Sequence, residues 1–224
     1  MKTEIVSFYA DISPCTYYSD HYKRLKLECE KHNIPYDFRN IESQEDYRLN
    51  CLRKPKFIAE MLEEKGRAIA WLDIDSTVHS TLEVLDTLMD KVDIGFAYPG
   101  INAQDIVAKF PKASPIFCNY TDNALDFLDK WIEECEKSRD STETLFDHEV
   151  LLFRVLPRLI QEKKIKIAAL PIQYCVWPGK CPAGIEPVIT MGIADHKAKE
   201  KDIRKLASQH GMDESLIQLN LNKI

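Results

Sequence analysis

Two aspartates, Asp73 and Asp75, directly follow the apolar segment Arg67 to Leu72, which is typical of a buried central strand. In an extended segment, side chains two residues apart point to the same side, so both carboxylates can face one ligand. Two neighbouring anions repel each other unless a cation or a proton lies between them, and Mg²⁺ or Mn²⁺ prefers carboxylates together with phosphate oxygens. The pair therefore predicts a divalent metal site that holds a phosphorylated substrate. The alternative is that both aspartates simply cap a following helix.

Alternating strands and helices are expected to position this pair. The pattern predicts strands over Glu4 to Ala10 and Pro35 to Asn40, with a helix over Tyr17 to His32 between them. A second helix is expected from Pro55 to Lys65, because proline suits a first helical turn and Gly66 ends the helix.

The second half of the chain continues this alternation. The expected elements are a helix over Leu82 to Lys91, strands over Val92 to Tyr98 and Ile116 to Tyr120, a helix capped by Thr121 or Asp122, a helix over Phe146 to Lys163 despite Pro157, strands over Ile165 to Leu170, Gln173 to Trp177 and Pro187 to Thr190, and a helix from Asp195. Strands that alternate with helices indicate an α/β fold, with a mostly parallel central sheet flanked by helices. We expect one domain over residues 1–224, with ligands beyond the carboxyl ends of the strands.

The composition is that of a globular protein and argues against a general nucleic-acid binder. Hydrophobic residues make up 45% of the 224 residues and charged residues 29%, with a net charge of −6. This charge leaves no surplus of cations for phosphate neutralisation. No apolar run is long enough for a transmembrane segment and no signal-peptide core opens the chain, so we expect a cytoplasmic protein. Seven cysteines without a CxxC pair argue against a structural zinc site.

A family resemblance is carried by two segments, Lys54-Pro55-Lys56-Phe57-Ile58 and Ala70-Trp71-Leu72-Asp73-Ile74-Asp75. They look like the core of nucleotide-diphosphosugar transferases with the Rossmann-like GT-A fold, whose DxD motif the second segment matches. The resemblance implies a glycosyltransferase of the hexosyltransferase type, with a UDP-sugar as the expected donor and a glycan or other hydroxyl as acceptor. It assigns Asp75 to Mn²⁺ or Mg²⁺ on the diphosphate and Asp73 to the ribose or the same metal, with Ile74 between them in the donor-binding motif. The chain is also compatible with being part of a longer multidomain protein.

The same resemblance places the nucleobase at the end of the opening strand, at Phe8, Tyr9, Ala10 and Asp11. The ring of Tyr9 can stack on a base, and a carboxylate or backbone group can bind the edge of the base. The alternative is that Tyr9 is a core aromatic residue. Lys54 matches a position that contacts the nucleotide or the sugar in the family, although exposed lysines are common.

A second acidic cluster, Asp147-His148-Glu149, begins an amphipathic helix. Acidic residues at a helix start are favoured by the helix dipole alone. In the family, an acidic residue at a comparable place faces the sugar or the acceptor, which makes Asp147 and Glu149 the catalytic candidates. These two side chains do not share a helix face, and we prefer Asp147. An inverting reaction needs such a base and a retaining one does not need it in the same place, and the sequence leaves both open.

Two late residues, His196 and Lys197, follow the strand-like segment Pro187 to Thr190. Glycogenin-like retaining transferases carry a late His on the metal and a nearby Lys on the diphosphate, and the resemblance gives those roles to His196 and Lys197. The downstream Gly and Lys-Pro-Trp of that family are absent, so a solvated helix start is the alternative. The spacing of Cys175, Cys181 and His196 is irregular for zinc.

A haloacid-dehalogenase-like phosphohydrolase is the main rival interpretation. The segment Leu72 to Val78 also resembles that family's first motif, with Asp73 as nucleophile and Asp75 as acid/base. Asp122 and Asp126 resemble its later acidic pair, but the motif lies behind two strand–helix units and the expected Gly-Asp is absent. A non-catalytic nucleotide-sugar-binding module is the third interpretation, because a fold alone does not establish an activity.

Overall fold

The computed structural model describes residues 2–12, 16–89, 91–97, 111–142, 144–162, 164–177, 181 and 183–192. Its strands are β1 (Glu4–Tyr9), β2 (Tyr36–Asn40), β3 (Ile69–Trp71), β4 (Thr77–Val78), β5 (Ile94–Ala97), β6 (Lys112–Cys118), β7 (Ile167–Leu170) and β8 (Ile189–Thr190). Its helices are α1 (Tyr17–Lys31), α2 (Tyr47–Leu52), α3 (Lys54–Lys65), α4 (Glu83–Asp86), α5 (Asp122–Arg139), α6 (Asp147–Val150) and α7 (Leu156–Glu162), with a π-helical turn (Leu151–Val155) and a 3-10 turn (Ile172–Tyr174).

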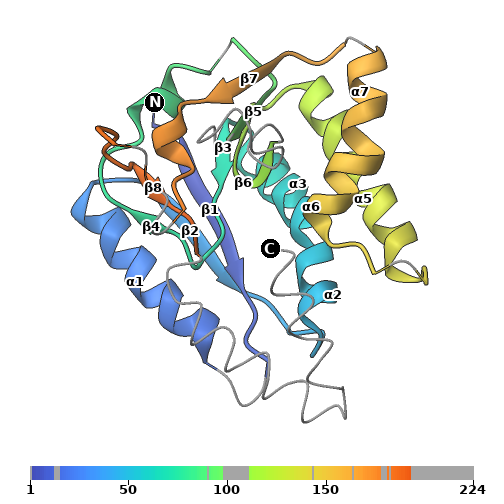
Figure 1. Ribbon diagram of the computed structural model, residues 1–224, viewed down its shortest axis with the longest axis horizontal. Helices are drawn as coiled ribbons and strands as arrows, with labels where there is room; N and C mark the ends of the chain where they lie inside the picture. The colour runs from blue at the N-terminus through green and yellow to red at the C-terminus, as the bar shows by residue number, and fades with distance from the viewer. Residues whose placement is uncertain are drawn as a thin grey trace.

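A six-stranded sheet with the order β2-β1-β3-β6-β5-β7 forms the centre of the fold (Figure 1). β1 is parallel to β2 and β3, and β5 is parallel to β7, whereas β6 runs antiparallel to both β3 and β5. All the strands of this sheet except β6 therefore run in one direction. The predicted α/β fold with a mostly parallel sheet flanked by helices is confirmed.

Helices cover both faces of the sheet, with α1 on one face and α3, α5 and α6 on the other (Figure 1). Successive side chains of a strand alternate between the faces. Val6 and Trp71 accordingly pack in the core under α3 and α5, while Ile5 and Leu72 pack in the other core with Leu25 of α1. The β3 region is thus buried on both faces, as its apolar run predicts.

Several helix boundaries follow the local signals in the sequence. Pro55 lies in the first turn of α3, and the helix ends at Gly66, whose φ of 57° is left-handed. Thr121 caps α5, since its hydroxyl oxygen accepts the N–H of Ala124 at 3.2 Å. A π-helical turn directly precedes α7, and a wider turn of this kind lets the helix continue into Pro157.

Two local expectations are wrong, and one helix was not expected. The segment before α3 contains the additional helix α2, whose start is capped by Asp46 through a 2.8 Å bond from the N–H of Leu49. The helix expected over Leu82 to Lys91 is limited to α4, and turns follow it. The segment Gln173 to Trp177 starts within a 3-10 turn instead of forming a strand. Short apolar stretches do not distinguish such turns from strands by periodicity.

No helix among the described residues is both long and apolar enough to cross a bilayer. The cysteines that the structure describes form no disulfide. Cys29, Cys118 and Cys135 are buried in the two cores, and burial raises the pKa of Cys29 to about 12. These thiols act as small apolar side chains.

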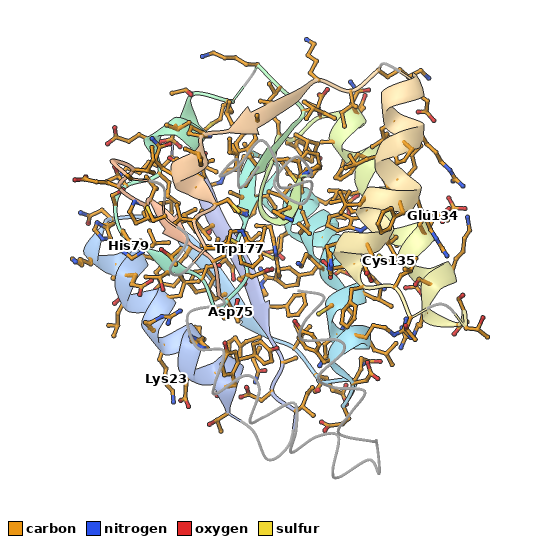
Figure 2. All side chains as sticks on the ribbon, in the orientation of Figure 1. Lys23, Asp75, His79, Glu134, Cys135 and Trp177 are labelled. Carbon is orange, nitrogen blue, oxygen red and sulfur yellow. The ribbon has the colours of Figure 1, made fainter. Side chains whose placement is uncertain are left out.

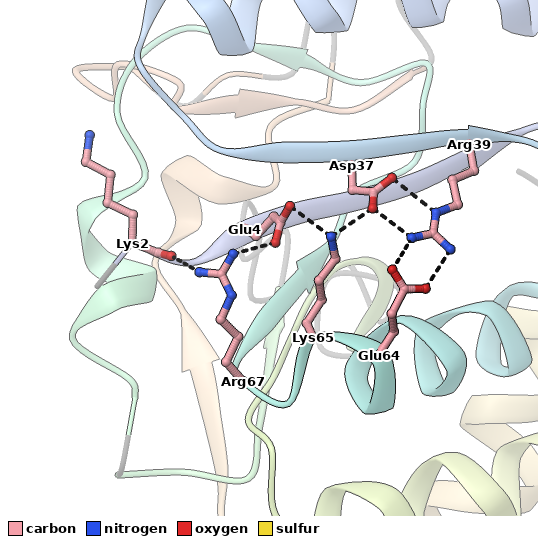
Figure 3. A network of polar contacts seen from close by, with 7 residues as sticks. All are labelled: Lys2, Glu4, Asp37, Arg39, Glu64, Lys65 and Arg67. Atoms are coloured by element: carbon pink, nitrogen blue, oxygen red, sulfur yellow. Dashed lines mark hydrogen bonds and ion pairs between the residues drawn. The ribbon is translucent and has the colours of Figure 1, made fainter.

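A network of ion pairs joins β1 and β2 to the end of α3 (Figure 3). Asp37 of β2 lies 2.8 Å from Arg39 and 2.8 Å from Lys65. Lys65 also lies 3.2 Å from Glu4, which in turn lies 2.6 Å from Arg67. The hydrogen bond from Arg39, aided by Lys65, outweighs burial and lowers the pKa of Asp37 to about 2.

An Asp37→Asn variant is expected to lose about 2 kcal/mol of unfolding free energy at neutral pH. The pKa of Asp37 is about 2 in the folded protein and 3.8 for an ordinary aspartate. The stabilisation is therefore complete at a pH above 3.8, and it is lost as the pH falls toward the lower pKa of the folded protein. Urea unfolding of both proteins should therefore show a difference that is constant above about pH 5 and vanishes near pH 2. The control is Asp20→Asn, which removes an exposed pair with Lys23. A difference in unfolding free energy between the wild type and Asp37→Asn that does not change with pH would contradict the lowered pKa of Asp37.

Candidate active site

Asp73 and Asp75 lie in a tight turn at the carboxyl end of β3. Leu72 still follows the sheet, since its N–H donates to the carbonyl of Val6 at 3.2 Å, and the N–H of Ser76 then donates to the carbonyl of Asp73 at 2.9 Å. β4 follows directly. The expectation of an extended pair is wrong, and so is the alternative of a helix cap. We call Asp73 to Ser76 the DxD turn; it keeps both aspartates at one strand end because it reverses the chain.

Lys54 joins Asp73 to Asp147. Its Nζ lies 3.0 Å from Asp73 Oδ1 and 2.8 Å from Asp147 Oδ2, and its side chain is 9% exposed. The same ammonium donates to the carbonyl of Ala113 at 3.3 Å and lies over the ring of Trp71. Since Lys54 begins α3 and Asp147 begins α6, the starts of two helices meet beside the DxD turn.

Carboxylates lie close together at this site. Asp75 and Asp147 both interact electrostatically with Asp73, and Lys54 pairs with Asp73 and Asp147. Burial raises the pKa of Asp73 more than Lys54 lowers it, and the other two carboxylates raise it further. Burial opposes the charge of Lys54, but Asp147 and Asp73 outweigh it and raise the pKa of Lys54. A cation bound beside these neighbouring carboxylates would reduce their mutual repulsion.

The residues present fit a divalent cation that shares its ligands with a phosphorylated substrate. Within the described part of the chain, no group of three or more His, Cys, Asp or Glu side chains is arranged to hold a metal by itself. Asp73 Oδ1 is occupied by Lys54 and by Trp71 Nε1 at 2.8 Å, while 35% of the Asp73 side chain is exposed. Mg²⁺ and similar ions use one or two carboxylates and complete their shell with phosphate oxygens and water.

Asp75 is the more buried aspartate of the pair, with 7% of the residue exposed against 35% of the Asp73 side chain. In the view of Figure 2, Asp75 lies next to α1. Its carboxylate lies directly against the backbone of Gly192, where an added Cβ would be 2.0 Å from Asp75 Cγ. A segment from late in the sequence therefore reaches the DxD turn.

Phe8 and Tyr9, expected near a nucleobase, lie at the end of β1 and belong to opposite cores. The ring of Phe8 lies 5.2 Å from those of Phe57 and Trp71. Tyr9 stacks on Tyr22 of α1 with ring centroids 4.6 Å apart. Both rings are partly buried, so each combines a packing role with some exposed surface.

Asp11 has a structural partner. Its Oδ1 accepts the N–H groups of Tyr18 and Ser19 at 2.9 and 3.1 Å, which satisfies two donors at the start of α1. Ala10 is buried, and the side chain of Ile74 lies in the core with α1. Binding of a nucleobase by these residues stays a prediction.

Of the two acidic candidates on α6, Asp147 contacts Lys54 and is 3% exposed. Glu149 instead accepts the N–H of Phe146 at 3.0 Å and so caps its own helix. This geometry agrees with the preference for Asp147, while the catalytic roles of both residues stay predictions. His196 and Lys197 lie outside the described residues.

Tyr47, the first residue of α2, was not singled out from the sequence. Its ring is parallel to that of Tyr18 at 6.5 Å and lies 5.7 Å from Phe146, which lies 6.0 Å from His148. We call these four rings the aromatic row. Cys51, burial and the three aspartates of the site raise the pKa of Tyr47. The Asp46 cap was the local signal for α2, but nothing local indicates that the four rings meet.

A cavity of about 790 Å³ lies at the opposite end of the sheet. Its lining includes Lys2 and Arg67, which precede β1 and β3, and Tyr120, which follows the antiparallel β6. Its cations already have partners: Lys2 Nζ donates to the carbonyl of Asn33 at 3.0 Å, and Arg67 pairs with Glu4. The DxD turn lies at the other end of β3, so this cavity is separate from it.

No protein-family model and no curated protein matches the sequence. Solved structures do match the fold. The chain is similar, over 89% of its length and with a TM-score of 0.64 and 11% identity, to the whole of a glycosyltransferase involved in the glycosylation of the major capsid of PBCV-1. Over 86% of its length it resembles 55% of the apo form of the glycosyltransferase GlyE of Streptococcus pneumoniae TIGR4, with a TM-score of 0.54 and 14% identity.

A third similar structure is the bifunctional glycosyltransferase WbbM, matched over 85% of this chain and 45% of that one, with a TM-score of 0.53 and 11% identity. The chain thus spans about half the length of the GlyE and WbbM chains, and the full length of the solved chain of the glycosyltransferase involved in the glycosylation of the PBCV-1 capsid. This chain therefore shares its fold with these solved glycosyltransferases.

Proposed function

We propose that this chain is a metal-dependent glycosyltransferase that moves a sugar from a nucleoside-diphosphate sugar, with UDP as the expected nucleotide, to an acceptor hydroxyl. One observation carries the proposal. In a fold shared with solved glycosyltransferases, Lys54 joins Asp73 to Asp147, and Asp75 lies in the same turn as Asp73, at the carboxyl end of β3, which is where ligands bind in open α/β sheets.

The DxD turn is proposed to bind the donor diphosphate through Mn²⁺ or Mg²⁺. Asp75 supplies the main protein ligand and Asp73 Oδ2 the second, or a contact to the ribose, because Asp73 Oδ1 is already occupied. His196 follows Gly192 by four positions in the sequence, and with Lys197 it is proposed to complete this site. A bound divalent cation would neutralise charge that grows on the departing diphosphate.

Asp147 is proposed to bind a sugar hydroxyl or to take the proton of the acceptor. Lys54 Nζ lies 2.8 Å from Asp147 Oδ2 and so holds this side chain beside the DxD turn, where a carboxylate can accept a proton or a hydrogen bond. Lys54 thereby links the donor side, at Asp73, to the side where sugar hydroxyls are expected. The aromatic row flanks Asp147 and offers partly exposed rings, on which the apolar face of a sugar ring can pack.

A thermal-shift panel of UDP- and GDP-sugars tests this function. At a donor concentration of 100 times Kd, Tm is expected to rise by about 5–10 °C, and to do so in the presence of Mn²⁺ or Mg²⁺ but not in EDTA. The same mixtures should slowly release free sugar from the correct donor. Phosphate release from an aryl phosphate, lost in Asp73→Asn, would instead support the hydrolase interpretation. A shift without any transfer or donor hydrolysis would indicate a binding module.

A further inference from the structure

Helix α1 holds the backbone of the DxD turn from one side. Arg24 Nη2 donates to the carbonyl of Asp75 at 2.8 Å and to the carbonyl of Ser76 at 2.9 Å. A guanidinium that binds two successive carbonyls fixes the path of the chain on both sides of the peptide between them. The carboxylate of Asp75 is left out of this contact, because Arg24 binds its backbone oxygen.

Glu28, one helical turn further along α1, holds the residues after the turn. Its Oε2 accepts the N–H of Val78 at 2.8 Å, and its Oε1 lies 3.5 Å from Arg24 Nε. Arg24 and Glu28 are neighbours on one helix face, so the pair orients each side chain toward β4. Figure 1 shows α1 lying beside β4.

Gly192 closes the other side of Asp75. Strand β8 pairs with β4, with Thr77 opposite Thr190 and Val78 opposite Ile189, and this pairing brings Gly192 against the Asp75 carboxylate. A Cβ at position 192 would lie 2.0 Å from Asp75 Cγ and Oδ1 and 2.2 Å from Oδ2. Any side chain there must displace the carboxylate or the backbone.

We infer that Arg24, Glu28 and Gly192 are positioning residues that fix the Asp75 carboxylate for a divalent cation. The inference rests on the proposed function, which makes Asp75 the metal ligand. Groups that orient a metal ligand without touching the metal strengthen binding, because the ligand is already placed when the ion arrives. The contacts of Arg24 and Glu28 fix the backbone of the DxD turn and of β4. Gly192, which has no side chain, leaves the space that the Asp75 carboxylate occupies.

The test combines metal affinity with the exchange of single amides. Arg24→Met, Glu28→Ala and Gly192→Ala are each expected to bind Mn²⁺, in the presence of UDP, about 10- to 100-fold more weakly than the wild type. In Glu28→Ala, the amide hydrogen of Val78 should exchange with solvent on the order of tenfold faster, because this amide loses one hydrogen bond. Glu28→Gln keeps an acceptor oxygen and should restore both values toward the wild type.

Lys26→Met is the matched control on α1, because Lys26 makes an exposed 3.9 Å pair with Glu30 and no contact to the DxD turn. It should bind Mn²⁺ as the wild type does. Wild-type Mn²⁺ affinity in Arg24→Met, Glu28→Ala and Gly192→Ala, with faster Val78 exchange in Glu28→Ala, would overturn the inference while leaving the proposed function intact. If the wild type itself does not bind Mn²⁺ in the presence of UDP, both the proposed function and this inference are contradicted.

Discussion

A Lys54→Met variant is expected to lose about 3–5 kcal/mol of unfolding free energy, which should lower Tm by more than about 6 °C. The ammonium of Lys54 lies within 3.0 Å of Asp73 and 2.8 Å of Asp147, and Asp147 is 3% exposed. Without the lysine, the buried carboxylate of Asp147 and the partly exposed carboxylate of Asp73 both lose the cation that they share. Thermal and urea unfolding would measure the loss.

Two further variants make this prediction specific. Lys56→Met changes an exposed lysine of the same helix and should alter stability by less than about 0.5 kcal/mol. Adding Asp147→Asn to Lys54→Met should recover part of the loss, because it removes one of the unpaired charges. Equal stability of Lys54→Met and Lys56→Met would show that the buried ion pairs are not formed in solution.

An Asp75→Ala variant is expected to abolish metal-dependent nucleotide binding, with an affinity loss of about 100-fold or more in calorimetry with Mn²⁺ and UDP. The fold should persist, since Arg24 binds the backbone carbonyl of residue 75 and not its carboxylate. In the absence of metal, the stability of the variant should stay near that of the wild type, because the substitution also removes the repulsion between Asp75 and Asp73. This combination of lost binding and kept stability separates a ligand from a structural residue.

The control for Asp75 is Asp126→Ala, which removes an aspartate with a 59% exposed side chain on α5. Its nucleotide affinity and stability should both stay near those of the wild type. Unchanged affinity in Asp75→Ala would remove Asp75 from the site. A large loss of stability without metal would point to a structural role for its carboxylate.

The sequence by itself determined the features that depend on neighbouring residues. The limits of α3 follow from Pro55 and Gly66, and the start of α5 follows from the Thr121 cap, because these signals act within one helical turn. The apolar run before Asp73 predicted a strand that is buried on both faces, and the alternation of such strands with helices predicted the layered α/β fold. The same local pattern was sufficient to single out the aspartate pair at a strand end.

Only the tertiary structure decided how the site is assembled. Lys54, Asp73 and Asp147 each have a local reason to occur where they do, yet their ion pairs depend on how α3 and α6 pack against the sheet. The contact of Gly192 with Asp75 likewise depends on the pairing of β8 with β4. Contacts of this kind join residues far apart in the chain, and their energy comes from burial and charge pairing in the folded state, which local propensity and spacing do not encode.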